Sequence, residues 1–243
     1  MKQYRCLIFD LDDTLYNFAY GQSVALEMLY AEYFPELDDY SFFKERYAVI
    51  NRSYWQQVEA GKISVGQLSA LRFAAIKAEF ATQVSVDDLV ESYRRVSCTQ
   101  RAWCQGAEQA IALLTKQFDC ALLSNGTLKD QQAKLHALGL TDVFKPVVLS
   151  DELGVSKPNQ KIFQPIFNEL NVEPKHCLLI GDSLTSDYQA ALNVGMDFCW
   201  FNEKKISRGD YPLPLVEIDD LMELVRYLRI IKASDGRFKD ELC

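Results

Sequence analysis

The sequence lacks any hydrophobic stretch long enough to cross a membrane. No run approaches the roughly 18 uninterrupted apolar residues that a spanning helix needs, and the apolar run at 6–9 is too short for an export signal. The chain ends in Lys239-Asp-Glu-Leu-Cys243, which is similar to a retention signal of the endoplasmic reticulum. Because such a signal must be terminal and Cys243 follows it, we expect the similarity to be fortuitous.

Cys-x-x-Cys pairs are also absent, and histidine is scarce. Seven cysteines, an odd number, occur without this spacing, which argues against a zinc site. Four of them lie in apolar runs typical of buried strands: Cys6, Cys120, Cys177 and Cys199. We expect them to be reduced, as in a cytoplasmic protein. The two histidines, His136 and His176, are expected in a helix and just before a strand, with structural roles.

Positive charge is in deficit too, since Lys and Arg number 26 against 34 Asp and Glu, and the net charge is −8. A broad electrostatic attraction to a nucleic acid polymer or to an acidic membrane is therefore not expected. A phosphate-bearing small molecule would have to be bound by local donors and a metal ion. Internal repeats and low-complexity tracts are absent, and 49% apolar residues can bury a proper core.

Short apolar runs recur at 4–10, 120–124, 147–149, 177–182 and 198–201. Their hydrophobicity is continuous, which is typical of strands buried on both faces in a parallel sheet. Helix-like segments lie at 107–116, 127–138, 159–170 and 185–194, and Gly195 is expected as the C-cap of the last. This alternation predicts an α/β, Rossmann-like core with its ligand site at the carboxyl ends of the strands.

The stretch between 17 and 99 differs, because it shows helical periodicity and no convincing strand. Apolar residues share a helical face in three sets: Val24, Met28 and Ala31; Leu68, Leu71, Ala75 and Ala78; and Leu89, Tyr93 and Val96. Pro35 is expected to end the first helix. We therefore predict a core formed by 1–16 and 100–243, with an all-helical domain, 17–99, inserted after the first strand.

Polar residues stand where several of the predicted strands end. The first strand runs into Asp10-Leu-Asp12, and alternation along an extended chain puts both carboxylates on the same side. The second ends in Ser124-Asn125-Gly126, directly before a helix. A helix N-terminus offers free backbone N–H groups, so this position favours an anion such as phosphate.

Lys157 and Asp182 complete the pattern. Lys157 stands before Pro158, which we expect at a helix start, where a cation needs an anionic partner. A later strand ends in Gly181-Asp182, and Asp187 follows one helical turn further on. Each feature alone is weak, since Asp at a strand end is often a turn former or a helix cap. In order, at the ends of successive elements, they indicate one site.

This series, Asp-x-Asp-x-Thr-Leu, Ser-Asn-Gly, Lys-Pro and Gly-Asp-x-x-x-x-Asp, resembles the four motifs of the haloacid dehalogenase (HAD) superfamily. The helical insert resembles that family's C1-type cap domain, so the resemblance covers the whole chain. It implies a Mg²⁺-dependent phosphomonoester hydrolase with Asp10 as the nucleophile that forms an aspartyl-phosphate. Asp12 would protonate the leaving group and later activate water, whereas dehalogenases and phosphonate-cleaving members lack an acid at this position.

The remaining catalytic roles follow from the same resemblance. Lys157 would add positive charge beside Asp10 and the phosphate, and Ser124 would bind phosphoryl oxygens with the backbone N–H groups of Asn125 and Gly126. The implied Mg²⁺ ligands are Asp10, the backbone carbonyl of Asp12 and Asp182, with Asp187 orienting ligands or water. Such a cation is needed, because a carboxylate and a phosphate ~4 Å apart repel by several kcal/mol at an effective dielectric of about 20.

The insert also resembles the cap of noncanonical pyrimidine 5′-nucleotidases. The similar segments are 51–55, 59–64 and 68–73, together with 154–159 and 199–202 in the core. This implies a nucleoside monophosphate as substrate, with Trp55 stacking on the base and Arg72 or Lys62 reaching a substrate oxygen. The alternative is that Trp55 fills the core of the cap and that both cations are solvated.

Other functions share the four motifs. A sugar-phosphate phosphatase, a phosphoglycolate phosphatase or a phosphomutase would carry the same core residues. A non-enzymatic, phospho-accepting receiver also combines acidic residues, a Ser or Thr and a Lys on a parallel sheet. Receivers are about half this length and pair two acids at the end of the first strand, so the helical insert and the late Asp182 argue against that class.

Overall fold

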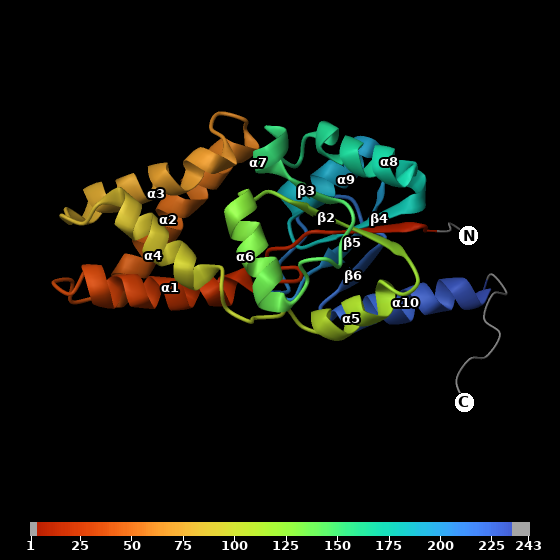
Figure 1. The fold of residues 1–243 in the computed structure, drawn as a ribbon, viewed down its shortest axis with the longest axis horizontal. Helices are drawn as coiled ribbons and strands as arrows, with labels where there is room; N and C mark the ends of the chain where they lie inside the picture. Colours follow the sequence, from red (N-terminus) through yellow and green to blue (C-terminus); the bar gives the residue numbers. More distant parts are fainter. Residues whose placement is uncertain (1–3, 235–243) are drawn as a thin grey trace.

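The computed structural model describes residues 4–234, in which six parallel strands form one sheet between layers of helices (Figure 1). The strands are β1 (Cys6–Phe9), β2 (Asp119–Ser124), β3 (Val147–Leu149), β4 (Cys177–Gly181), β5 (Asp197–Phe201) and β6 (Val216–Ile218). Their order is β3-β2-β1-β4-β5-β6, so β1 is central. Phe9 pairs with Leu122 of β2 and with Ile180 of β4, and the residues following these strands therefore emerge side by side.

The Rossmann-like α/β core is thus confirmed, and the five predicted strands are present within two residues of their expected ends. Strand β6 was not expected. It is only three residues long, it lies at the edge of the sheet, and its central residue, Glu217, is exposed. A strand of this kind carries too few apolar residues for a recognisable hydrophobic run.

Each face of the sheet is covered by its own hydrophobic cluster. Leu7 and Phe9 of β1 point to the side covered by α5 (Ala107–Leu114), α6 (Leu128–Leu138) and α10 (Leu221–Ser234). Cys6 and Ile8 point to the opposite side, which is covered by α8 (Gln164–Leu170) and α9 (Gln189–Val194). Because both faces are buried, apolar residues fill successive positions of the strand, and each buried large side chain contributes roughly 1.5–3 kcal/mol.

The core helices follow their predicted ranges with irregular first turns. The segment predicted at 159–170 begins as a 3-10 turn, η1 (Gln160–Phe163), and the one at 185–194 begins as a π turn, η3 (Leu184–Tyr188). Gly195 caps α9 with φ 67°, as expected. The prediction that Pro158 starts a helix was wrong, because Asn159 is the N-cap and the turn begins after it.

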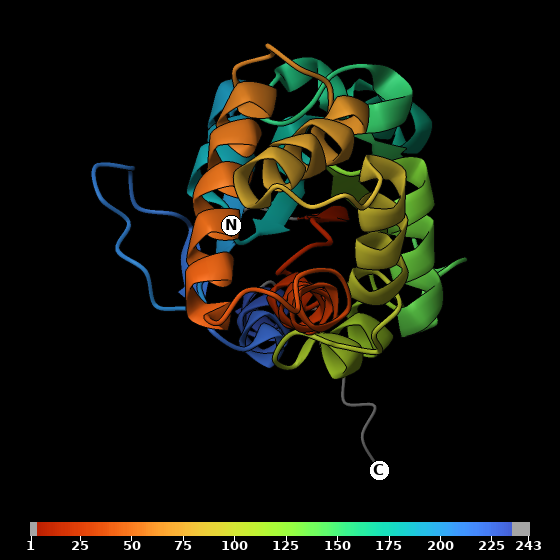
Figure 2. The ribbon, with the colours of Figure 1, turned by 90° about the vertical axis from the view of Figure 1, so that its left-hand side faces the viewer.

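Helices α1 (Phe18–Tyr33), α2 (Tyr40–Glu59), α3 (Val65–Phe80) and α4 (Val86–Ser97) form a separate lobe beyond the carboxyl ends of the strands (Figures 1 and 2). No strand occurs between them. Each helix begins with a side-chain N-cap, namely Asn17, Asp39, Ser64 and Ser85. Such caps satisfy the free N–H groups of the first turn and stabilise each helix by about 1 kcal/mol. The first helix ends before Pro35, as expected.

Two of the three predicted apolar faces in this lobe were only partly right, since Met28 packs against the core of the lobe and Leu68 is buried while other members are exposed. In α1 the buried face carries Ala25, Leu26 and Leu29, whereas Ala31 is exposed. In α3 it carries Leu68, Phe73 and Ile76, whereas Leu71 and Ala78 are exposed. These helices have apolar residues on several sides, so sequence periodicity does not single out the packed face. Leu89 and Tyr93 of α4 are buried as predicted, and Val96 packs against the same cluster.

None of the helices in the described part of the chain is long and apolar enough to span a membrane. Six of the cysteines are buried and form no disulfide, including the four expected in strands. His136 lies in α6 and His176 in η2 (Pro174–His176), directly before β4. The segment 239–243, with its similarity to a retention signal, lies outside the described residues.

Candidate active site

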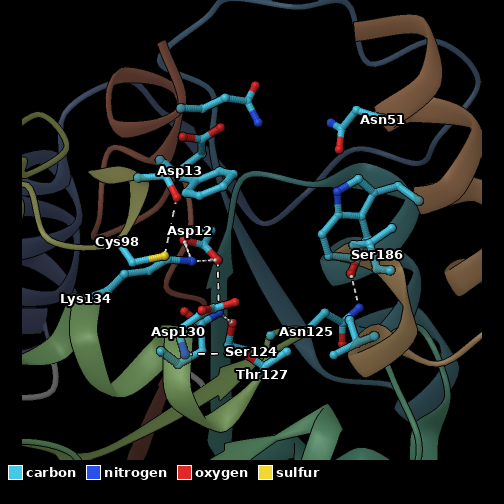
Figure 3. A pocket seen from close by; sticks show the side chains of 18 of the residues that line it. Asp12, Asp13, Asn51, Cys98, Ser124, Asn125, Thr127, Asp130, Lys134 and Ser186 are labelled. Atoms are coloured by element: carbon cyan, nitrogen blue, oxygen red, sulfur yellow. Dashed lines mark hydrogen bonds and ion pairs between the residues drawn. The ribbon is translucent and has the colours of Figure 1, made fainter. Parts of the chain in front are cut away.

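A cavity of about 460 Å³ lies between the carboxyl ends of the central strands and the helical lobe. All eight core residues predicted as site residues line it: Asp10, Asp12, Ser124, Asn125, Gly126, Lys157, Asp182 and Asp187. Figure 3 shows Asp12, Ser124 and Asn125 on the core side, with Asn51 of α2 across the cavity. The fold therefore brings four distant stretches of sequence to one place, because parallel strands all end at the same edge of the sheet.

Lys157 occupies the centre of a buried ionic network. Its Nζ lies 2.5 Å from Asp10 Oδ1 and 2.6 Å from Asp187 Oδ1, and it donates to the Leu123 carbonyl at 3.0 Å. Burial alone would lower the pKa of Lys157, but the negative charges of Asp10 and Asp187 raise it above its ordinary value. The ammonium is therefore a permanent positive charge at the floor of the cavity.

The backbone of Lys157 is positioned by Asn125. The Asn125 side chain accepts from the Lys157 N–H at 2.8 Å and donates to the Lys157 carbonyl at 3.0 Å. It also donates to Ser186 Oγ at 3.3 Å. The amide of the Ser-Asn-Gly motif thus joins the second and third motifs.

Three carboxylates lie too close together for a single lysine to balance. One oxygen each from Asp10, Asp182 and Asp187 lies within 4.8 Å of the others. Burial raises the pKa of Asp10 to about 7, although Lys157 opposes this shift. Burial, followed by the charges of Asp187 and Asp10, also raises the pKa of Asp182 well above its ordinary value. Negative charge is therefore in excess here.

This acidic trio fits a divalent cation. Carboxylate oxygens are the ligands that Mg²⁺ prefers, and its charge would offset the mutual repulsion. The Asp182 side chain has no hydrogen bond or ion pair within residues 4–234, so both of its oxygens are available. Asp187 is already engaged, since its Oδ2 accepts from the Ser183 N–H at 3.1 Å while Oδ1 contacts Lys157. A Cβ on Gly181 would lie 2.5 Å from this carboxylate, so only glycine fits there.

Two residues of α6 that were not predicted contact Asp12. Gln131 Nε2 and Lys134 Nζ donate to Asp12 Oδ2 at 2.9 and 2.8 Å, and Gln131 also donates to Ser124 Oγ at 2.7 Å. Both side chains are buried. The available signal was their place on the same helix face as Leu135 and Leu138, where a buried polar residue needs a partner.

Lys204 and Thr14 were missed as well. Lys204 lines the cavity and forms an ion pair with Asp13 Oδ2 at 2.7 Å. Burial would lower the pKa of Lys204, but Asp13 raises it above the ordinary value. Thr14 Oγ1 donates to Asp10 Oδ2 at 3.4 Å. Lys204 lies in a loop after β5 that carries no motif, whereas Thr14 is the threonine of the Asp-x-Asp-x-Thr-Leu motif, to which no role was assigned.

The helical lobe contributes the opposite wall. Arg72 is buried, its Nη1 donates to Asn51 Oδ1 at 2.8 Å, and its guanidinium lies 4.9 Å from the Tyr93 ring centroid. Within the described chain no carboxylate pairs with this guanidinium. Trp55 also lines the cavity while packing partly against the small cluster around Val58.

Lys62 does not join this wall. It is exposed and lines a separate depression between the α2–α3 loop and the segment 150–159 of the core. Of the three residues predicted in the insert, the structure therefore brings Trp55 and Arg72 to the cavity but leaves Lys62 outside it. Asn51 and Gln22, which donates to the Tyr93 hydroxyl at 2.9 Å, line the cavity and were not predicted.

Comparison with known proteins gives a consistent picture. The model of the haloacid dehalogenase-like hydrolase family matches residues 4–195. The HAD hydrolase YfnB of Bacillus subtilis is 32% identical over 95% of this chain and 97% of its own length. The pyrimidine 5′-nucleotidase PynA of Streptococcus pneumoniae is 29% identical over 91% of this chain and 94% of its own. The glyceraldehyde 3-phosphate phosphatase of Pyrococcus furiosus is 32% identical over 62% of this chain and 63% of its own.

A solved structure extends the comparison to three dimensions. The crystal structure of YfnB bound to magnesium, described as revealing interdomain movement, has a TM-score of 0.83 at 31% identity. It covers 94% of this chain and 100% of that chain. The similarity therefore includes both the core and the helical lobe.

Proposed function

Since the chain belongs to the haloacid dehalogenase-like hydrolases and is a phosphatase, we propose that it removes phosphate from nucleoside 5′-monophosphates, pyrimidine nucleotides above all. The observation that carries this proposal is the cavity itself. It has an acidic, lysine-containing floor for a phosphoryl group and a wall that includes the aromatic rings of Trp55 and Tyr93 and the buried guanidinium of Arg72. Its volume is in the range of small-molecule sites.

In this proposal the reaction proceeds through an aspartyl-phosphate. Asp10 attacks phosphorus in line with the ester oxygen, and Asp12 gives that oxygen a proton as the P–O bond breaks. Asp12 then takes a proton from the water that releases phosphate from Asp10. Lys157, 2.5 Å from Asp10, favours the ionised nucleophile and stabilises charge on the phosphoryl oxygens.

Ser124 and the turn that follows it would bind the transferred group. The Ser124 hydroxyl faces the cavity from the end of β2, and the backbone N–H groups of Asn125 and Gly126 lie just before α6. Donors at a helix N-terminus stabilise the charge that shifts onto phosphoryl oxygens in the transition state.

We propose Mg²⁺ as the cofactor. When bound it would supply positive charge that offsets the repulsion between the nucleophile and the phosphate. Asp10, Asp182 and the backbone carbonyl of Asp12 would be its protein ligands, and Asp187 would orient ligands or water. The buried excess of negative charge in these residues supports this assignment.

Recognition of the leaving group would belong to the insert, 17–99, acting as a cap over a core of 1–16 and 100–243. Trp55 would stack on the base, and Arg72 with Asn51 would bind a carbonyl oxygen of a pyrimidine. A buried guanidinium without a carboxylate partner favours a substrate oxygen with partial negative charge. Lys62, although predicted, has no such placement in the cavity.

A sugar-phosphate phosphatase is the second candidate, supported by the partial match to a glyceraldehyde 3-phosphate phosphatase. In either case the partner is a small phosphorylated metabolite. The buried, unlinked cysteines suit a reducing compartment, and we propose the cytoplasm.

A substrate screen separates the two candidates. Phosphate release from UMP, dUMP, dTMP, glyceraldehyde 3-phosphate, phosphoglycolate and glucose 6-phosphate would be measured with and without Mg²⁺. We expect a pyrimidine nucleotide to have the highest kcat/KM and Mg²⁺ to be required. A sugar phosphate that exceeds every nucleotide tenfold, or by about 1.4 kcal/mol in transition-state stabilisation, would overturn the nucleotidase assignment.

A further inference from the structure

We propose that Gln131 and Lys134 of α6 are positioning residues for the acid–base group, which orient the Asp12 carboxylate toward the leaving-group oxygen. This inference rests on the proposed function, in which Asp12 transfers the proton. It assigns a role to two buried polar side chains that none of the four sequence motifs contains.

Among the described residues, Lys134 forms an ion pair with Asp12. Its Nζ lies 2.7 Å from Asp12 Oδ1 and 2.8 Å from Oδ2, and the aromatic ring of Phe18 lies 4.4 Å away. The Lys134 side chain is 4% exposed and that of Asp12 is 30% exposed. Burial would lower the pKa of Lys134, but Asp12 raises it above its ordinary value, so the lysine stays charged. The carboxylate is thus bound on its buried side and open toward the cavity.

Gln131 links the acid–base group to the phosphate site. One amide nitrogen, Nε2, donates both to Asp12 Oδ2 and to Ser124 Oγ, and the side chain is fully buried. The glutamine packs so tightly that a Cβ on Gly126 would lie 2.0 Å from Nε2. Gly126 has no positive φ, so the motif requires glycine here for space and not for backbone conformation.

The direction of these contacts matters for the chemistry. Without them, the carboxylate of Asp12 would be free to turn toward Lys157, since both residues line the same cavity. Gln131 and Lys134 instead fix it from the α6 side, since Oδ2 accepts from both and the buried Oδ1 lies 2.7 Å from Lys134 Nζ. The part of the Asp12 side chain that is exposed, 30%, therefore keeps one orientation in the cavity.

The step that depends on this orientation is the first one. Asp10 forms a bond to phosphorus, the P–O ester bond breaks, and its electron pair goes to the ester oxygen, which takes the proton of Asp12 and leaves as an alcohol. Nitrophenolate leaves as a stable anion and needs no proton. A defect in proton delivery therefore lowers kcat/KM for a nucleoside monophosphate far more than for p-nitrophenyl phosphate.

The test compares these two substrates in Gln131→Leu and Lys134→Met, with Asp12→Asn as the reference for lost proton transfer. We expect kcat/KM for UMP to fall roughly 10- to 100-fold in both variants. This is less than the full contribution of general acid catalysis, which is about 10²–10⁴-fold, because Asp12 itself remains. For p-nitrophenyl phosphate we expect a fall of less than about threefold, and Lys134→Arg should recover part of the UMP activity. Lys129→Met, on the exposed side of the same helix, serves as the matched control and should match the wild type for both substrates.

Equal losses for both substrates would mean that the two residues only support the fold, and would overturn the inference. If Asp12→Asn lowers kcat/KM more for UMP than for p-nitrophenyl phosphate but Gln131→Leu and Lys134→Met do not, the inference fails while the proposed role of Asp12 stands. If Asp12→Asn itself does not discriminate, the proposed acid–base role fails with it. Should Lys134→Met not fold, the near-isosteric Gln131→Leu still decides the question.

Discussion

At the scale of single residues, the site is governed by an imbalance of charge. The carboxylates of Asp10, Asp182 and Asp187 lie close together, and Asp10 and Asp187 contact Lys157. Burial raises the pKa of Asp10 to about 7 despite this contact. A buried cluster of like charges destabilises the folded state, and clusters of this kind are typical of functional sites. Substitutions here are therefore expected to remove activity more than stability.

The nucleophile gives the first prediction. Asp10→Asn should abolish turnover, since an amide does not form the aspartyl-phosphate, while the protein stays folded because a like-charge repulsion is also relieved. Phosphate release from UMP and the melting temperature would be measured together. Activity within tenfold of the wild type would show that another residue attacks phosphorus.

Arg72 gives the second prediction, which tests leaving-group recognition. Arg72→Met should lower kcat/KM for UMP tenfold or more, because a charge-assisted hydrogen bond is worth about 1.5–3 kcal/mol. Hydrolysis of p-nitrophenyl phosphate, which offers no pyrimidine oxygen, should change little. Arg52→Met, an exposed position on the neighbouring helix, is the control. A loss shared equally by both substrates would instead indicate damage to the lobe as a whole.

At the scale of elements, two linkers connect the helical lobe to the core and are joined by Tyr16. The buried Tyr16 hydroxyl donates to the Ser97 carbonyl at 2.8 Å and accepts from the Gln100 N–H at 3.2 Å. Gly21 lies against the same point, where a Cβ would come 2.5 Å from the Ser97 carbonyl oxygen. The Tyr16 side chain thus ties the two linkers together, in addition to backbone hydrogen bonds such as that from the Asn17 N–H to the Ala102 carbonyl at 2.8 Å.

We therefore expect Tyr16→Phe to loosen this junction. Two buried backbone groups would lose their partner, at a cost of about 1–3 kcal/mol, which corresponds to a melting temperature lower by roughly 2–10 °C. Limited proteolysis should cut the variant faster than the wild type between 97 and 103. Unchanged stability and cleavage would mean that the hydroxyl contributes nothing to the attachment of the lobe.

At the scale of the whole molecule, stability, pH and metal binding are linked. The folded state raises the pKa of Asp10 to about 7 and that of Asp182 well above its ordinary value. Without metal, their contribution to stability is therefore fully present below the unfolded value of about 4 and is lost as the pH rises through these raised pKa values, about 7 for Asp10. A cation bound by these carboxylates would offset their repulsion and so counter the loss of stability at high pH. It would stabilise the protein because it binds only the folded chain.

The fourth prediction follows from this linkage. Mg²⁺ at a hundredfold excess over its Kd should stabilise the protein by about 2.7 kcal/mol and raise the melting temperature by roughly 5–10 °C, with a larger gain at about pH 7.5 than at about pH 5.5. Thermal unfolding with EDTA or Mg²⁺ would measure this, and Asp182→Asn should lose most of the gain. A gain that does not depend on pH or on Asp182 would place the metal elsewhere.

Much of this protein is readable from its sequence alone. Continuous apolar runs predicted β1 to β5, and the polar residues behind them predicted the floor of the cavity, because parallel strands end at a common edge whatever else surrounds them. The edge strand β6 escaped notice, since three residues carry no distinct pattern. Apolar runs and the polar residues that follow them were sufficient to predict the floor of the cavity, because there the backbone topology alone brings the side chains together.

Only the tertiary structure decided which side chains support and enclose that floor. Contacts such as Gln131 to Asp12 and Arg72 to Asn51 join residues on separate elements, and Lys62 lies outside the cavity that Trp55 lines. In helices with apolar residues on several sides, packing decides which of these residues are buried, so α1 and α3 bury only part of the predicted faces. Sequence order determines where strands end, whereas the angle and rotation of one helix against another are settled by the fit of side chains.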